Sequence, residues 1–482
     1  DITIDWGYLY LASRGCNEVT YRQDGRSCLT AALSMTAEDG KRSEKVLAIA
    51  YDDIASIQYF GDVCKGYWAR NGKTILQAIG EALAEYKTLR SRCQLFDEGL
   101  LSEAETLGGK SYAKLCAAGY RQSIAAHKLI ADKDGNVVFI SKECFSNGCA
   151  ATVDVSYPSV PLYLLYQPEL VKGMLRPVFE YAKLPVWEYD FAPHDVGRYP
   201  YVWGQVYALQ QHVGQDGVHP ANYSYPKGSN IFDDRYQMPV EECGNMLIMT
   251  AAVALSDGDT AFVLEQMPLL EQWVGYLLEY GADPGDQLCT DDFAGHLAHN
   301  SNLAAKAILG VEAYSILLDM LGRAMEAASY HNKAAAMAKD WERRAASGDH
   351  TVLSFGEPES WSLKYNLIWD KLFESNLFPE KTYERELAWY LAHCNEFGVP
   401  LDSRKDYTKS DWMIWAASFT DTREVLERFA EPLVNFLENA PARTPFSDWF
   451  DTKTAKQEGF QNRTVQGGLF MPLLKKHWSM EE

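Results

Sequence analysis

The sequence predicts a mainly α-helical protein, in which one closed ring of helical hairpins takes up most of the chain. Three observations predict this fold class. The chain has 482 residues, of which 47% are hydrophobic, so a large core can form. From Lys73 onward, apolar residues recur at helical spacing. No repeat is visible along the sequence, which argues against an open solenoid of stacked hairpins.

Composition excludes several classes of function. The chain has 45 Lys and Arg against 66 Asp and Glu, a formal net charge of −21. A nucleic-acid partner would need a basic face, so none is expected. No run of about 18 apolar residues occurs, so no membrane span is expected. Aromatic residues make up 13% and suit either a large core or a cleft for flat polar ligands.

The N-terminus and the cysteines limit what can be said of compartment and redox state. The chain begins at Asp1 without an initiator Met or a signal peptide, so we expect a processed chain or an excised fragment. Its ten cysteines are scattered and include no CxxC pair, which argues against a zinc ribbon or a thioredoxin-like site. Free thiols are therefore expected rather than disulfides.

The first seventy residues are expected to be β-structure. Ile2, Ile4, Trp6, Tyr8 and Tyr10 all occupy even positions, the period-2 pattern of a strand. A turn at residues 23–25 and an apolar run at 46–51 indicate further strands. Seventy residues offer few pairing partners, so residues 1–70 are interpreted as the C-terminal remnant of a β-sandwich domain.

The rest of the chain is expected to be helical. A linker helix with a connecting loop is expected at residues 71–110, where the loop covers 99–109, and the ring at 111–482. Asp421 with Glu424 matches a capping box before an amphipathic helix. The other helices are expected at 112–131, 158–183 in pieces, 244–255, 260–280, 302–321, 323–346 and 380–397. Long loops at 184–237, 281–300, 347–379 and 398–411 are the expected functional segments.

Six polar blocks in and around these loops could carry chemistry. Adjacent Glu241 and Glu242 could include a general acid, although acids at a helix start also serve the helix dipole. Asp291 and Asp292 form a second acid pair without the spacing of an EF-hand. The other candidates are Asp154, which could be only a cap, His194, Asp195, Arg198, Asp402, Arg404, Asp411, Trp412, Asp448 and Trp449.

Read together, these blocks resemble the glutaminase A family of fungal secreted glutaminases and their bacterial, Bacteroidetes-type relatives. The resemblance rests on KECFSNG, TVDVSYPSVPLYLLY, FAPHDVGRYP, MPVEECGNMLI, DQLCTDDFAGHLAHNSNLAAKAILG, KYNLIWDKL, GVPLDSRKDYTKSDW and PFSDWFDT, in that order from about residue 110 to the end. GFQNRTVQGG at 459–468 looks like the closing segment of the family, and DWGY at 5–8 resembles the end of its β domain. The resemblance implies an (α/α)6 toroid of six helical hairpins, hydrolysis of glutamine to glutamate and ammonia, and export to the periplasm, cell surface or medium.

The leading hypothesis is amide hydrolysis without a metal or another cofactor. One carboxylate would activate water and another would protonate the leaving ammonia, with Glu241 or Glu242 and Asp291 or Asp292 in these roles. Arg198 or Arg404 would pair with the carboxylate of the substrate, and Trp412 and Trp449 would line the site. The expected partner is a small polar substrate, glutamine or a sugar. A glycoside hydrolase and a non-catalytic glycan-binding protein remain the alternatives.

Overall fold

The computed structural model describes residues 6–480 except 17, 24, 26, 37–38, 41, 214–218 and 443–444. The expected strand residues Ile2 and Ile4, and Asp24 of the expected turn, lie outside the described residues. All ten cysteines are described, and each is a free thiol. Within the described chain, no helix combines the length and the apolar character that a membrane span requires.

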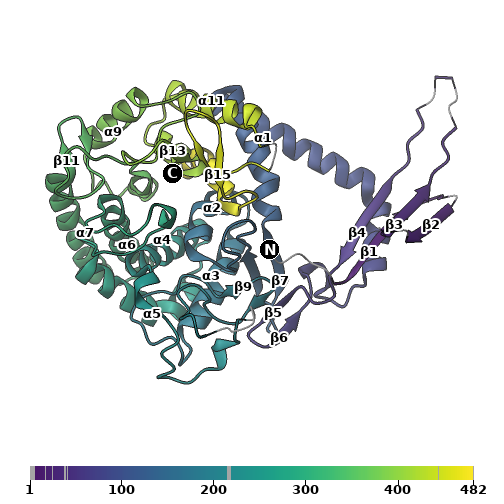
Figure 1. Cartoon of the computed structure of the whole chain (residues 1–482), viewed down its shortest axis with the longest axis horizontal. Helices are drawn as coiled ribbons and strands as arrows, with labels where there is room; N and C mark the ends of the chain where they lie inside the picture. The colour runs from purple at the N-terminus through teal and green to yellow at the C-terminus, as the bar shows by residue number, and fades with distance from the viewer. Residues whose placement is uncertain are drawn as a thin grey trace.

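The centre of the molecule is a closed ring of inner helices (Figure 1). Each inner segment is buried on nearly all faces, as in α2, where every residue from Val153 to Leu164 is buried. In the part of the chain that the structure describes, the ring consists of α2 (Val153–Tyr166), α4 (Pro239–Asp257), α6 (Ser301–Met320), η6 with α8 (Tyr365–Leu367 and Ile368–Leu372), α10 (Ser410–Ala417) and η7 with α12 (Thr464–Phe470 and Met471–Trp478). These segments pack against one another in that order, and η7 packs against α2, which closes the ring.

A second layer of helices surrounds the inner ring. Each outer helix buries one stripe, as α11 does with Leu426, Phe429, Leu433 and Phe436. The outer layer consists of α1 (Ile75–Ala125), α3 (Pro168–Ala182), α5 (Thr260–Tyr280), α7 (Ala324–Ala345), α9 (Glu380–Ala392) and α11 (Arg423–Asn439). The outer helices alternate with the inner segments along the chain, and α1 packs against α11. The expected (α/α)6 toroid is therefore confirmed.

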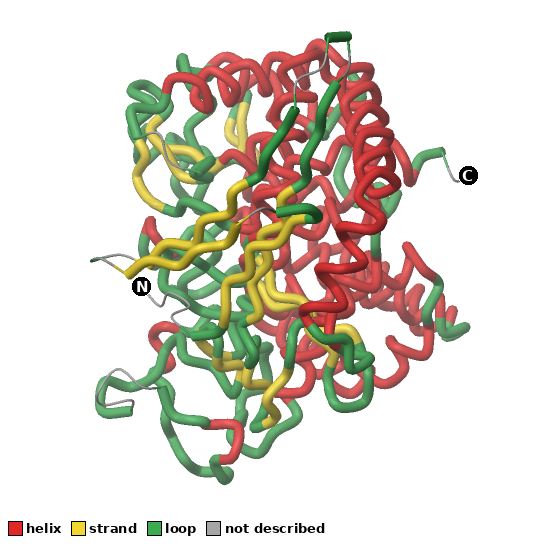
Figure 2. Tube along the Cα trace, turned by 90° about the vertical axis from the view of Figure 1, so that its right-hand side faces the viewer, coloured by secondary structure: helices red, strands yellow, loops and turns green. Residues whose placement is uncertain are grey.

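The N-terminal strands project away from the ring, to the right in Figure 1 and toward the viewer in Figure 2. β1 (Tyr8–Ser13) pairs antiparallel with β4 (Leu47–Asp52), and β2 (Glu18–Gln23) pairs with β3 (Ser27–Ala32). Helix α1 connects these ribbons to the ring. It begins at the capping box of Thr74 and Gln77 and bends at Gly109, whose φ of 72° is a left-handed conformation that glycine tolerates.

Short strands hold the loops at one end of the ring. β5 (Ile57–Tyr59) pairs in parallel with β10 (Tyr201–Val202), which ties the N-terminal part to the loop that carries His194. The remaining strands are β6 (Asp62–Cys64) and β9 (Gly197–Arg198) in the same sheet, β7 (His127–Ala131) with β8 (Val137–Ser141), β11 (Ala346–Ser347) with β12 (His350–Thr351), and β13 (Tyr407–Lys409) with β14 (Trp449–Asp451) and β15 (Gln457–Gly459).

Three local predictions are wrong. The expected loop at 99–109 is helical up to the bend at Gly108 and Gly109, where the side chains of α11 lie close. The helix expected at 112–131 ends at Ala125, because residues 127–131 pair as a strand with 137–141. Asp421 does not cap α11: Thr422 is its N-cap, and Asp421 instead forms an ion pair with Lys475 at 2.9 Å.

Helices α4 and α6 cross at glycines. A Cβ atom on Gly310 of α6 would lie 3.3 Å from the Cα atom of Gly244 on α4 and 2.6 Å from Cδ1 of Leu277. Only glycine at these positions allows the two backbones to come so close. The crossing brings the acidic N-terminal turn of α4 next to α6.

Replacing Gly310 by alanine is therefore expected to destabilise the fold by ~1–3 kcal/mol, the usual cost of overpacking a core. The matched control is Gly275→Ala in α5, where a Cβ atom would meet nothing within 4 Å. That change should stabilise the protein by ~0.5–1 kcal/mol, because alanine favours a helix interior. Urea denaturation followed by circular dichroism measures both, and equal effects would contradict the close crossing.

Candidate active site

The inner segments bring polar side chains together from their N-terminal ends. Asp154 lies in the first turn of α2, Glu241 and Glu242 in that of α4, and Asp411 in that of α10. Arg463 is the residue directly before η7. The positive end of a helix dipole favours carboxylates at such positions. One end of the ring thus collects acids from segments that are far apart in the sequence.

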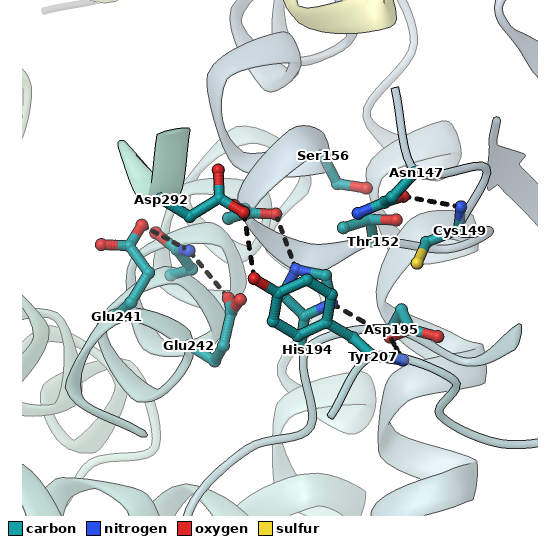
Figure 3. A network of polar contacts seen from close by, with 12 residues as sticks. Asn147, Cys149, Thr152, Ser156, His194, Asp195, Tyr207, Glu241, Glu242 and Asp292 are labelled. Carbon is teal, nitrogen blue, oxygen red and sulfur yellow. Dashed lines mark hydrogen bonds and ion pairs between the residues drawn. The ribbon is translucent and has the colours of Figure 1, made fainter. Parts of the chain in front are cut away.

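His194 lies between two carboxylates. Its Nδ1 atom lies 3.0 Å from Oδ2 of Asp195, and its Nε2 atom lies 3.6 Å from Oδ1 of Asp154. Asp195 also accepts hydrogen bonds from the backbone N–H groups of Gly197, Val206 and Tyr207 at 2.9–3.0 Å. The imidazole ring stacks on Tyr207 at 4.1 Å, as Figure 3 shows. These contacts fix the orientation of the imidazole.

Glu241 and Glu242 have different surroundings although they are adjacent. Glu241 forms a buried ion pair with Lys306 of α6, whose ammonium also lies 4.2 Å from the ring centre of Tyr157. Asn245 donates hydrogen bonds to both acids, at 3.0 Å to Glu241 and 2.9 Å to Glu242. Oε1 of Glu242 is buried and has no hydrogen-bond partner among the described residues. Glu241 is therefore held by a cation, whereas Glu242 has a free oxygen.

Asp291 and Asp292 each accept a hydrogen bond from a tyrosine. The hydroxyl of Tyr365 donates to Asp291 at 2.9 Å. The hydroxyl of Tyr207 donates to Asp292 at 3.0 Å, as Figure 3 shows. Trp412 is fully buried and stacks on Tyr365 at 3.9 Å, with 6° between the ring planes. Trp412 thus supports Tyr365 from behind. Oδ1 of Asp291 is buried and unpartnered within the described chain.

A third acidic pair lies on the α10 side. Asp448 and Asp411 are fully buried, and Nζ of Lys409 lies 2.5 Å from Asp448 and 3.7 Å from Asp411. Trp449 is half-buried and packs on Phe293, with ring centres 4.5 Å apart. The two acids therefore share one lysine.

Two arginines that the sequence suggested for a substrate carboxylate have protein partners instead. Arg404 donates two side-chain hydrogen bonds to Asp402, at 3.0 and 2.7 Å. Arg198 donates to the backbone oxygen of Asn147 at 2.7 Å. The Asp402–Arg404 pair lies beside Asp291 and borders an open cleft of about 540 Å³ that Trp361 and His393 also line.

Burial raises the pKa of several of these acids into the neutral range. It raises the pKa of Asp154 to about 7 and that of Asp291 to about 7, because the ionised forms lose hydration. The pKa of Asp411 rises to about 6 for the same reason, and that of Glu242 rises well above its usual value. Such groups can exchange protons at neutral pH, as general acids and bases must.

His194 carries the opposite charge. Burial alone would lower its pKa, but the carboxylates of Asp154 and Asp195 outweigh burial and raise the pKa to about 10. The side chain is therefore an imidazolium at neutral pH. The donor atoms of Asp154, His194 and Glu242 lie within 4.8 Å of one another, so a divalent metal ion could replace the proton there. The sequence-based prediction of a metal-free site stays a prediction.

Several residues of this group were missed from the sequence. Lys306 and Asn245 lie within largely apolar helices, and a lysine inside an apolar run of such a helix was the signal that could have revealed Lys306. Lys409 and Arg463 occur in the quoted motifs but were not selected as candidates. Tyr207 and Tyr365 carried no local signal, because their partners are distant in the sequence.

The fold and this acidic centre define a protein of the six-hairpin (α/α)6 class. A solved wild-type glycosidase shares the fold with a TM-score of 0.51 at 13% identity, covering 77% of this chain and 98% of the other. A glycosidase variant in complex with glucose gives the same TM-score and identity, covering 76% and 98%. At this level of identity the likeness concerns the fold alone.

The chain belongs to the glutaminase A family, because the model of the glutaminase A six helical-hairpin domain matches residues 109–473. A model of a domain of unknown function matches residues 22–103. Glutaminase A of Aspergillus oryzae is 30% identical over 441 residues, covering 89% of this chain, and a protein of Arthroderma benhamiae named as a probable glutaminase is 26% identical, covering 90%. The chain spans 60% and 59% of the lengths of these two relatives.

Replacing Lys306 by methionine is expected to destabilise the protein by ~3–5 kcal/mol, because Glu241 would stay buried without its cation. The double variant Lys306→Met with Glu241→Gln should recover part of this loss. Lys183→Met, which removes an exposed ion pair with Glu265, is the control and should cost under ~1 kcal/mol. Urea denaturation gives all three values. A Lys306 variant as stable as the control would contradict the buried pair.

The charge of His194 predicts a pH-dependent signal. In a protein with labelled histidines, the imidazole resonance that disappears in His194→Gln should keep its protonated position at pH 8.5 and shift as the pH passes through about 10. Since the unfolded value is about 6.5, this proton stabilises the fold fully below pH ~6.5, and its contribution is lost as the pH rises through about 10. A resonance that titrates near pH 6.5 would refute the imidazolium.

Proposed function

We propose that the protein hydrolyses the side-chain amide of glutamine to glutamate and ammonia. The observation that carries the proposal is a pair of carboxyl groups, the buried Glu242 and the half-buried Asp291. Both have raised pKa values and a buried oxygen atom without a partner among the described residues. They lie on different elements beside the Glu241–Lys306 ion pair. Membership of the glutaminase A family supports amide hydrolysis as the reaction.

In the proposed mechanism, Asp291 is the general base and Glu242 is the general acid. Asp291 in its ionised form removes a proton from a water molecule, whose oxygen then bonds to the amide carbon. The tetrahedral intermediate collapses as the C–N bond breaks. Protonated Glu242 gives its proton to the leaving nitrogen, so that ammonia and the carboxylic acid form. The acid then loses its proton to the solvent and leaves as glutamate, and proton exchange with the solvent returns Asp291 and Glu242 to their starting states.

The surrounding charges support these roles of Glu242 and Asp291. Burial and the neighbouring carboxylate of Asp154 favour the protonated form of Glu242, which a general acid requires. The pKa of about 7 for Asp291 lies near neutral pH, where a general base is most effective. Glu241 stays paired with Lys306, and Asp292 stays bonded to Tyr207, so we assign both to maintaining the site.

Glu242→Gln and Asp291→Asn are each expected to lower the rate of ammonia release from L-glutamine by ~10²–10⁴-fold, the usual contribution of acid–base catalysis. The control Glu265→Gln removes an exposed acid outside the site and should keep full activity. Circular dichroism shows whether each variant folds. Full activity of both site variants would contradict these assignments.

The same assay separates the alternatives. Reducing sugar released from a panel of glycosides, without ammonia from glutamine, would identify a glycosidase. Binding of glycans without turnover would indicate a glycan-binding protein. Loss of ammonia release on chelation, with recovery on addition of a divalent ion, would assign the activation of water to a metal at Asp154, His194 and Glu242.

A further inference from the structure

Arg463 is a buried guanidinium for which the described residues provide no hydrogen-bond or ion-pair partner. Its side chain is enclosed by the ring, and the residue is only 5% exposed. Across the described residues it forms neither a hydrogen bond nor an ion pair, and its Nε atom is buried and unsatisfied. Burying a charge without a partner is costly, so a folded protein rarely keeps such a group unless a ligand binds it.

The position of Arg463 is determined by its neighbours. Its guanidinium carbon lies 4.2 Å from the ring centre of Phe460, which supports the flat cation from one side. Phe460 and Asn462 have φ values of 54° and 59°, a left-handed conformation that is strained for phenylalanine and tolerated by asparagine. The next residues form η7, which packs against α2 and α10. The fold thus maintains a strained turn that fixes this side chain.

Arg463 is connected to the proposed catalytic acid Glu242 through Asp154, whose carboxylate favours the charge of Arg463 and has an oxygen atom within 4.8 Å of one of Glu242. The carboxylates of Asp448, Glu143, Asp154 and Asp411 are near enough to favour its charge after burial disfavours it, yet none of these pairs with it. The guanidinium therefore keeps the capacity to bind an anion.

We propose that Arg463 binds a carboxylate of the substrate, so that the protein acts on amides that also carry a free carboxylate. A guanidinium and a carboxylate form two parallel charge-assisted hydrogen bonds. Arg404 already makes two side-chain hydrogen bonds to Asp402, and Arg198 already donates one of its N–H groups to the backbone oxygen of Asn147, whereas the side chain of Arg463 makes no hydrogen bond to any described residue. For glutamine this group is the α-carboxylate. The choice of amides as substrates rests on the proposed function. The binding of a carboxylate by Arg463 does not.

The test compares two substrates in two proteins. L-Glutamine carries the α-carboxylate, whereas in L-glutamine α-N-methylamide a neutral group replaces it, and ammonia can come only from the side chain. Arg463→Met should lower kcat/KM for glutamine by ~10–100-fold, mainly through KM, because a charge-assisted pair is lost. For the methylamide, the same variant should change kcat/KM less than threefold. Arg463→Lys should recover only part of the preference for glutamine over the methylamide, since a lysine ammonium cannot form two parallel hydrogen bonds to a carboxylate.

Arg344→Met is the matched control, because Arg344 also lies over an aromatic ring, at 4.0 Å from Phe355, but pairs with Asp283 at 2.7 Å. It should leave both substrates unaffected. Equal losses for the two substrates in Arg463→Met would overturn the inference and show that Arg463 only balances the neighbouring acids.

A binding experiment separates this inference from the proposed reaction. Calorimetry with glutarate and with the neutral diamide glutaramide should show tighter binding of glutarate to the unaltered protein and no such preference in Arg463→Met. If glutamine releases no ammonia but this preference is found, the proposed function fails and the carboxylate site stands. If the preference is the same in both proteins, the carboxylate site fails.

Discussion

The ion pair of Glu241 with Lys306 is the interaction on which the arrangement of the site depends. It joins α4 to α6 at the point where Gly244 and Gly310 let the two helices approach closely. Burying both charges costs hydration, and their attraction together with the hydrogen bond from Asn245 offsets this cost. Lys306 neutralises the charge of Glu241. Its neighbour Glu242 can therefore be buried in the protonated form, and the site contains no uncompensated charge from this pair of acids.

The closed ring explains why acids accumulate at one end. The inner segments present their N-terminal ends there, so their dipoles favour Asp154, Glu242 and Asp411. Burial in the ring works against ionisation of the same groups. The balance between the two effects places several pKa values near neutrality, whereas an exposed carboxylate would be ionised throughout this range.

The sequence predicted α5 to the residue but did not predict α10, for a physical reason. Helix α5 has one buried stripe, so its periodicity gave the observed bounds Thr260–Tyr280. Helix α10 (Ser410–Ala417) is buried on all sides and shows no such period, and no helix was predicted there: its first two residues fall in the loop expected at 398–411. His194 and Asp195 were found because they are adjacent, but the approach of Arg463 to the acids of α2 and α10 requires the ring to close.

The raised pKa values have a consequence for any ligand of this site. Asp154, Asp291 and Asp411 have pKa values of about 7, 7 and 6, so each is partly protonated near neutral pH and can take up or release a proton. A bound carboxylate would stabilise the protonated acids around it, and a bound ammonium would stabilise the ionised ones. Binding is then coupled to uptake or release of protons from the solvent, and the affinity of a ligand changes with pH even where the ligand itself does not titrate.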